Sequence, residues 1–164
     1  MAGMTKTEFL KSSNLVESPL LYYVDGYKYQ SRSDMVFHAF VYPDHNIVTD
    51  LIILRKDGWM WISKYFAWDG ASGPTWDDST NIRASLPHDA FGALFRMGLL
   101  DLRWLPASGD LLHRLMIEDG ATKIRADYYR YAVNNIYTGW ADQNSARKMM
   151  VSPHMIKMNI GAPA

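Results

Sequence analysis

The sequence of 164 residues contains no cysteine. This absence excludes disulfide bonds, a thiolate nucleophile, iron–sulfur clusters and zinc sites built from cysteine. Any metal site must therefore use histidine and carboxylate side chains. An excess of one charge is also lacking, because 17 Lys and Arg residues balance 17 Asp and Glu residues. Such a composition provides no overall attraction to nucleic acid or to an anionic membrane, so we do not expect nucleic acid among its partners.

Long apolar runs are absent as well. The longest, around Asp50–Leu54, is far shorter than a membrane span, and the N-terminal residues lack the apolar stretch of a signal peptide. The length and the 48% of hydrophobic residues are typical of one folded domain. We expect an N-terminal arm over residues 1–19, a single domain over residues 20–143 and a basic, Met-rich tail over residues 144–164.

The first half of the domain has the pattern of β-strands. Asp25-Gly26 separates Leu20–Val24 from Tyr27–Tyr29, which predicts a hairpin with a two-residue turn. Met35–Tyr42 predicts a further strand. A second hairpin is predicted around Asp57-Gly58, where both turn residues tolerate positive φ.

That second hairpin joins Ile47–Arg55 to Trp59–Phe66. Alternation in its second strand places Trp59 and Trp61 on one face, and Met60 and Ile62 on the other. We interpret the tryptophans of this region as core residues rather than a platform for sugars; they are Trp59, Trp61, Trp68 and Trp76.

The second half has helical spacing. A first helix is predicted from the cap residues 78–80 through Leu86, and Pro87 is expected to break or kink it or to start a new helix. Phe91, Leu94 and Phe95 recur at helical spacing, and Gly98 is placed to end their helix. Ser108 or Asp110 would cap a further helix over Leu111–Glu118, which Asp119-Gly120 would end. The last helix is predicted from Ala121 to about Tyr137, with an apolar stripe formed by Ile124, Tyr128, Tyr131, Ala132 and Ile136. The expected fold is α+β, with a small antiparallel sheet in the N-terminal half packed against a segregated group of three to four helices in the C-terminal half.

Five polar residues stand where a strand or loop leads into a helix, which is where a folded domain often presents polar side chains to a cleft. These candidate site residues are Asp69, Ser72, His88, Asp89 and Asp110.

Three segments carry a resemblance to a known family: Trp68–Pro74, Pro87–Phe91 and Gly109–His113. In this order they resemble the bacteriophage and prophage proteins of domain-of-unknown-function family 1353. The resemblance covers about residues 51–140 and departs from the family pattern at Gly73 and Gly109. It implies a phage origin and a shared fold, and it carries no reaction with it.

The same residues allow three chemical interpretations. Asp69, His88, Asp89 and Asp110 could hold a divalent ion such as zinc, manganese or iron, which would activate a water molecule for hydrolysis. Without a metal, Ser72 and His88 with an aspartate could form a nucleophile and its base. In the third interpretation these residues are helix caps and turn residues, and a buried His88 bonded to Asp69 or Asp110 joins the sheet to the helices.

We favour a bacteriophage structural or accessory protein, either a virion component or a factor for assembly or host interaction. The expected partners are proteins, bound through the N-terminal arm and the C-terminal tail, with further copies of the chain or a phage particle among them. We expect no membrane partner, and localisation in the host cytoplasm or the virion. The alternative is a small metal-dependent hydrolase using Asp69, His88, Asp89 and Asp110, so the sequence leaves open whether the protein is an enzyme.

Overall fold

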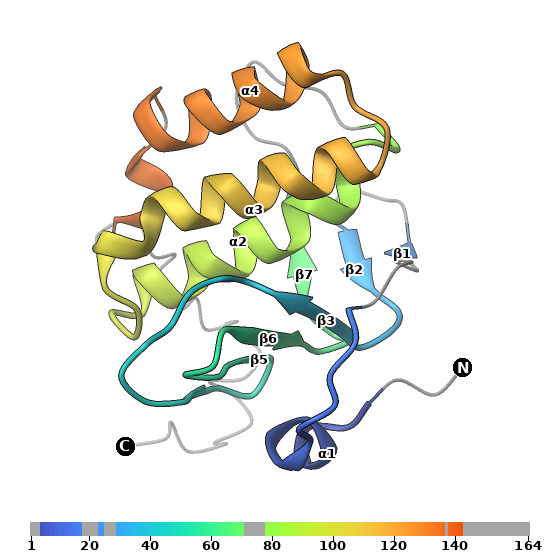
Figure 1. The fold of residues 1–164 in the computed structure, drawn as a ribbon, viewed down its shortest axis with the longest axis vertical. Helices are drawn as coiled ribbons and strands as arrows, with labels where there is room; N and C mark the ends of the chain where they lie inside the picture. The colour runs from blue at the N-terminus through green and yellow to red at the C-terminus, as the bar shows by residue number, and fades with distance from the viewer. Residues whose placement is uncertain (1–3, 18–22, 25–28, 71–77, 137, 143–164) are drawn as a thin grey trace, which may run out of the picture.

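A computed structural model describes residues 4–17, 23–24, 29–70, 78–136 and 138–142 of the chain (Figure 1). The fold is α+β, as predicted, with antiparallel strands in the N-terminal half and three α-helices in the C-terminal half of the described chain. The strands form two small sheets instead of the single sheet that we expected. The expected tail over residues 144–164 and the candidate Ser72 lie outside the described residues.

The larger sheet has the strand order β3-β6-β5-β4. Its strands are β3 (Met35–His38), β4 (Ile47–Val48), β5 (Ile52–Leu54) and β6 (Trp59–Ile62). The hairpin between β5 and β6 is confirmed, but its loop has three residues, because the Arg55 and Trp59 backbones bond across it and Gly58 N–H donates to the Arg55 carbonyl. Gly58 alone adopts positive φ, at 89°, so the predicted pair of positive φ angles at Asp57 and Gly58 is wrong.

The smaller sheet has the strand order β1-β2-β7. Its strands are β1 (Tyr23–Val24), β2 (Tyr29–Ser31) and β7 (Ala67–Trp68). Strands β1 and β2 pair antiparallel, as predicted for these two segments. Val24 pairs with Gln30, so five residues of the sequence lie between these two partners. The predicted two-residue turn at Asp25-Gly26 falls on residues that lie outside the described part of the chain.

The two faces of the larger sheet contact different parts of the chain. Met60 and Ile62 point into the main core beneath the helices, whereas Trp61 packs on the opposite face against Phe9. The alternation predicted for β6 is therefore confirmed. Phe9 lies on helix α1 (Lys6–Lys11), which Figure 1 shows on the side of this sheet away from the other helices.

Helix α1 is held in place by polar contacts as well as by Phe9. Thr5 and Glu8 form a reciprocal capping box at its start. At its end, the Arg55 guanidinium donates to the carbonyls of Phe9 and Ser12 at 3.0 and 2.7 Å. The described part of the expected N-terminal arm is therefore a packed element of the fold.

Helix α2 (Ile82–Arg96) is one continuous helix with Pro87 inside it. The expectation that Pro87 breaks the helix or starts a new one is therefore wrong. The Pro87 ring is buried and packs among the core residues around it. The predicted end is confirmed: Gly98 has φ of 67°, and the N–H groups of Gly98 and Leu99 bond back to Phe95 and Leu94.

Helix α3 (Leu105–Glu118) begins six residues earlier than predicted, after a 3-10 turn over Leu102–Trp104. Asp110 therefore lies in the middle of the helix, so its predicted role as a cap is wrong. Ser108 is not the cap either, since its hydroxyl donates to the Leu105 carbonyl inside the helix. The predicted end at Asp119-Gly120 is confirmed, with Gly120 at φ of 92°.

Helix α4 (Lys123–Tyr131) continues into a π-helical turn over Ala132–Ile136. Helices α2, α3 and α4 stack in successive layers above the sheets (Figure 1). The residues of the predicted apolar stripe do not all face the core. Ala132 is buried, whereas the side chains of Ile124, Tyr128 and Tyr131 are exposed. None of the described helices combines the length and apolar character needed to cross a lipid bilayer.

Candidate functional site

Three of the predicted site residues meet where β7 leads towards α2. Asp69 follows β7 directly, and His88 and Asp89 lie on α2. The backbone N–H of Asp69 donates to Asp89 Oδ2 at 3.3 Å, and His88 Nδ1 lies 3.4 Å from Asp89 Oδ1. Asp89 thus joins the end of the smaller sheet to the helix.

A buried hydrogen bond beside this corner fixes the same two elements. Trp68 Nε1–H donates to the Ser85 hydroxyl at 2.9 Å, and that hydroxyl donates to the Ile82 carbonyl. Both side chains are almost fully buried. Trp68 directly precedes Asp69, and Ser85 lies one helical turn before Asp89. Their buried hydrogen bond therefore fixes the position of Asp69 relative to Asp89.

Asp110 takes no part in that corner. Its side chain is 64% exposed on α3, and its carboxylate faces Arg130 of α4 at 3.5 Å. The sequence predicted Asp110 at the start of a helix, where an aspartate can be either a helix cap or a residue that lines a cleft. Because α3 begins earlier, at Leu105, Asp110 lies at an exposed position beside α4.

The metal-binding interpretation needs three or more ligands converging on one point. Across the described ranges of the chain, no group of three or more histidine and carboxylate side chains is arranged to hold a metal ion. The side chain of Asp69 is exposed, and its backbone N–H contacts Asp89. The described residues of this corner therefore do not converge as the ligands of a zinc, manganese or iron centre do.

The geometry of the corner matches the third interpretation most closely, with one change. We expected His88 to bond Asp69 or Asp110 and so connect sheet and helices. The bonds shown at this corner run through the Asp89 carboxylate, which connects the sheet to the helix and which His88 contacts from the same helix. This arrangement can hold the chain after β7 in place against α2.

The most extensive charged network of the described chain is centred on Arg114 of α3, and none of its residues was among the predicted site residues. Its guanidinium donates to both carboxylate oxygens of Glu17 at 2.9 and 3.1 Å, to Glu118 at 2.8 Å and to the His38 carbonyl at 3.0 Å. Glu118 in turn accepts from Arg83 of α2. The spacing of Arg114 and Glu118 predicts a helical ion pair, but nothing in the sequence points to Glu17, 97 residues away.

The environment of Glu17 changes its titration. Burial opposes ionisation of this carboxyl and is the largest single influence on its pKa. The hydrogen bonds from Arg114 and from the His38 N–H, with the charge of Arg114, together outweigh burial and lower the pKa below its ordinary value. Glu17 is therefore ionised in the folded protein over a wider pH range than in the unfolded chain.

A second ion pair joins the segment before α2 to α4. Asp78 bonds Arg125, and Arg125 also donates to the Tyr129 hydroxyl at 3.3 Å and lies over its ring. Burial opposes ionisation of Asp78, but the bonds from Arg125 and Thr80 lower its pKa overall. Asp78 was not among the candidate site residues predicted from the sequence.

No protein-family model, curated protein or solved structure matches this chain. The resemblance to the phage family therefore stays a prediction from the sequence motifs.

Proposed function

We propose that this chain is a structural or accessory protein of a bacteriophage that assembles with further copies of itself through the outer face of helix α4. The phage origin rests on the sequence resemblance. The observation that supports assembly is the exposure of three large apolar side chains on that helix. Ile124 is 84% exposed, Tyr128 44% and Tyr131 59%.

These three residues follow one another at spacings of four and three, so they share one face of the helix. The opposite face is buried and includes Ala126 and Tyr129. An apolar helix face directed at solvent is typical of a surface that a partner covers. We name this surface, made of Ile124, Tyr128 and Tyr131, the α4 patch.

The size of the α4 patch favours a repeated contact over a stable isolated dimer. Three side chains of this kind cover roughly 400 Å², about half of what each partner contributes to a stable interface, which is about 800 Å². Two free copies would therefore associate weakly. In a particle that holds many copies, each weak contact is reinforced by its neighbours, so a small patch suffices.

Sedimentation velocity over a concentration series tests this proposal. The wild-type chain should show reversible self-association that begins at about 0.1 mM, and an Ile124→Ser/Tyr128→Ser variant should stay monomeric throughout. Val16→Ser is the matched control, because Val16 is 81% exposed but lies in the N-terminal arm. A wild-type chain that stays monomeric, or a loss of association in Val16→Ser alone, would overturn the role of α4.

Removing residues 144–164 separates this proposal from the sequence-based expectation that the tail contacts partners. If self-association persists in the shortened chain and is still lost on changing Ile124 and Tyr128, α4 carries the contact. If the shortened chain is monomeric while its α4 patch is intact, the tail carries the contact and the proposal is wrong.

The alternative, a metal-dependent hydrolase, is less well supported because Asp110 lies away from the Asp69–Asp89 corner and no described set of ligands converges there. Elemental analysis of purified protein, incubated with zinc and manganese and then desalted, addresses it directly. We expect far less than one metal ion per chain. One ion per chain that disappears in His88→Ala would favour the hydrolase.

A further inference from the structure

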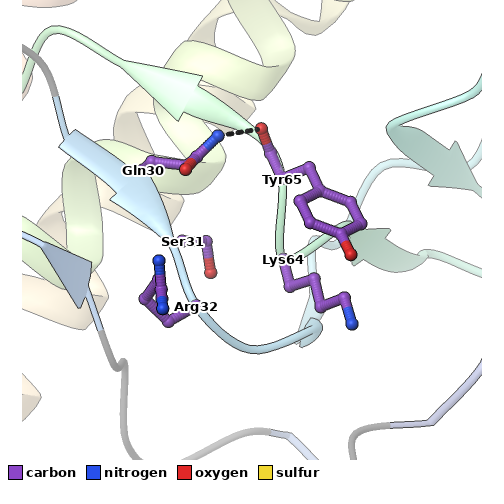
Figure 2. A pocket seen from close by; sticks show the side chains of 5 residues that line it. All are labelled: Gln30, Ser31, Arg32, Lys64 and Tyr65. Carbon is purple, nitrogen blue, oxygen red and sulfur yellow. Dashed lines mark hydrogen bonds between the residues drawn. The ribbon is translucent and has the colours of Figure 1, made fainter.

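A hollow of about 240 Å³ lies between β2 and the segment that leads from β6 to β7. Figure 2 shows its lining from close by: Arg32 and Ser31 stand on the side of β2, and Lys64 and Tyr65 stand across from them. Gln30 closes one end, where its side-chain amide donates to the Tyr65 carbonyl at 3.3 Å. The hollow is separate from the Asp69–Asp89 corner and from the α4 patch.

The lining of this hollow is cationic. Two of its five residues carry a positive charge, and none carries a negative charge. Ser31 is fully buried and its hydroxyl already donates to the Ser33 carbonyl at 2.6 Å, so it presents only its oxygen. The donors available to a ligand are therefore the Arg32 guanidinium, the Lys64 ammonium and the second amide proton of Gln30.

Neither of these two cations makes an ion pair within the described residues, a property that they share with exposed lysines such as Lys56. Lys64 lies over the Tyr65 ring at 5.0 Å, and both cationic side chains are exposed. Elsewhere in the described chain, most arginines have an acidic partner, as is the case for Arg55, Arg83, Arg103, Arg114, Arg125 and Arg130.

One acid stands close to the hollow without lining it. Asp34 Oδ1 accepts the backbone N–H of Lys64 at 2.8 Å, which holds the carboxylate on the main chain of this segment. Its contact with Lys64 is therefore made to the backbone, and the ammonium group at the end of that side chain is left for a ligand. The same bond fixes the backbone position of Lys64.

We propose that this hollow binds the phosphate group of a small phosphate monoester. An arginine and a lysine on two sides of one hollow suit a compact oxyanion that accepts several hydrogen bonds at once, when the flexible end of Lys64, which Figure 2 shows beside the Tyr65 ring, turns towards Arg32. Tyr65, which is 62% exposed, supplies a ring against which the organic part of the ester can lie. The volume leaves space for a substituent beyond the phosphate itself.

Amide chemical-shift titrations with inorganic phosphate and with phenyl phosphate, at constant ionic strength, test the proposal. Both should produce saturable shifts around residues 30–32 and 64–65, with Kd of about 1–10 mM for phosphate. Phenyl phosphate should bind at least about threefold more tightly, and Tyr65→Ala should remove that difference, because the ring contact is lost.

Charge-neutral variants decide whether the two cations hold the anion. Arg32→Gln and Lys64→Gln should each weaken binding by about threefold or more, and the double variant should show no saturable shift. Lys56→Gln is the matched control, since Lys56 is exposed and lies outside the hollow. Unsaturable wild-type shifts, or an equal loss of affinity in Lys56→Gln, would overturn the proposal. All these side chains are exposed, so unchanged dispersion of the spectra will establish that the variants are folded.

Discussion

Replacing Arg114 by methionine should destabilise the protein by removing the centre of the network between the N-terminal arm and the helices. Methionine retains an unbranched apolar side chain and removes the charge and all the hydrogen bonds. The side chains of Arg114 and Glu17 are 31% and 29% exposed, so their pair lies between the two well-characterised limits. Exposed ion pairs contribute up to about 1 kcal/mol, and breaking a fully buried pair costs about 3–5 kcal/mol.

From this intermediate burial we expect Arg114→Met to lower the free energy of unfolding by about 2 kcal/mol. A double-mutant cycle isolates the part that belongs to Glu17. Urea denaturation of wild type, Glu17→Gln, Arg114→Met and the double variant should yield a coupling energy of about 1–1.5 kcal/mol at pH 7. The matched cycle on Lys123 and Asp127, an ion pair on the exposed surface of α4, should show a clearly smaller coupling.

The pH dependence of this coupling follows from the lowered pKa of Glu17. A carboxyl group whose pKa is lower in the folded state stabilises that state fully above its ordinary value of 4.5, and loses this contribution as the pH falls through the folded value. The coupling should therefore be constant from pH 7 to about 5 and decline in more acidic solution. A coupling at pH 7 no larger than that of Lys123 with Asp127, or one that increases on acidification, would refute the reasoning.

Three further substitutions test the packing. Phe9→Ala should cost about 3 kcal/mol in urea denaturation, because Phe9 is fully buried on the outer face of the larger sheet; a loss below about 1 kcal/mol would mean that α1 is not docked. Ser85→Ala should cost about 1–3 kcal/mol, since it leaves the buried Trp68 N–H without its acceptor; an unchanged denaturation midpoint would contradict the bond. Gly109→Ala should destabilise, because its Cβ would lie 2.3 Å from Asn134 Oδ1, but should stabilise in an Asn134→Ala background, where helix propensity alone acts; the same sign in both backgrounds would exclude the clash.

The parts of the fold that sequence predicted correctly depend on contacts between near neighbours. The ends of α2 and α3 follow from Gly98 and Gly120, which adopt the positive φ that a helix end requires. The alternation of β6 follows from the two-residue period of a strand. These features need no knowledge of what lies across the molecule, so their residues alone determine them.

The errors arose where a local signal has two meanings. A proline can begin a helix or lie within it, and only the packing around Pro87 decides between them. An aspartate that begins an apolar run looks like a cap, but the segment before Asp110 is itself helical. Of the candidate site residues, Asp69, His88 and Asp89 are brought together, and Asp110 lies elsewhere on the molecule.

Helix α4 shows why the remaining surface could not be predicted from apolar spacing. The side that faces the protein buries Tyr129, whose hydroxyl accepts hydrogen bonds from Asn81 and Arg125. The helix is thus held by a polar contact that spans 48 residues of sequence, and the three residues of the α4 patch are directed outward. In an isolated chain the exposed Ile124 side chain contributes no apolar burial to the stability of α4. That burial is gained if another protein covers the α4 patch, which is why this helix is the first place to look for a partner.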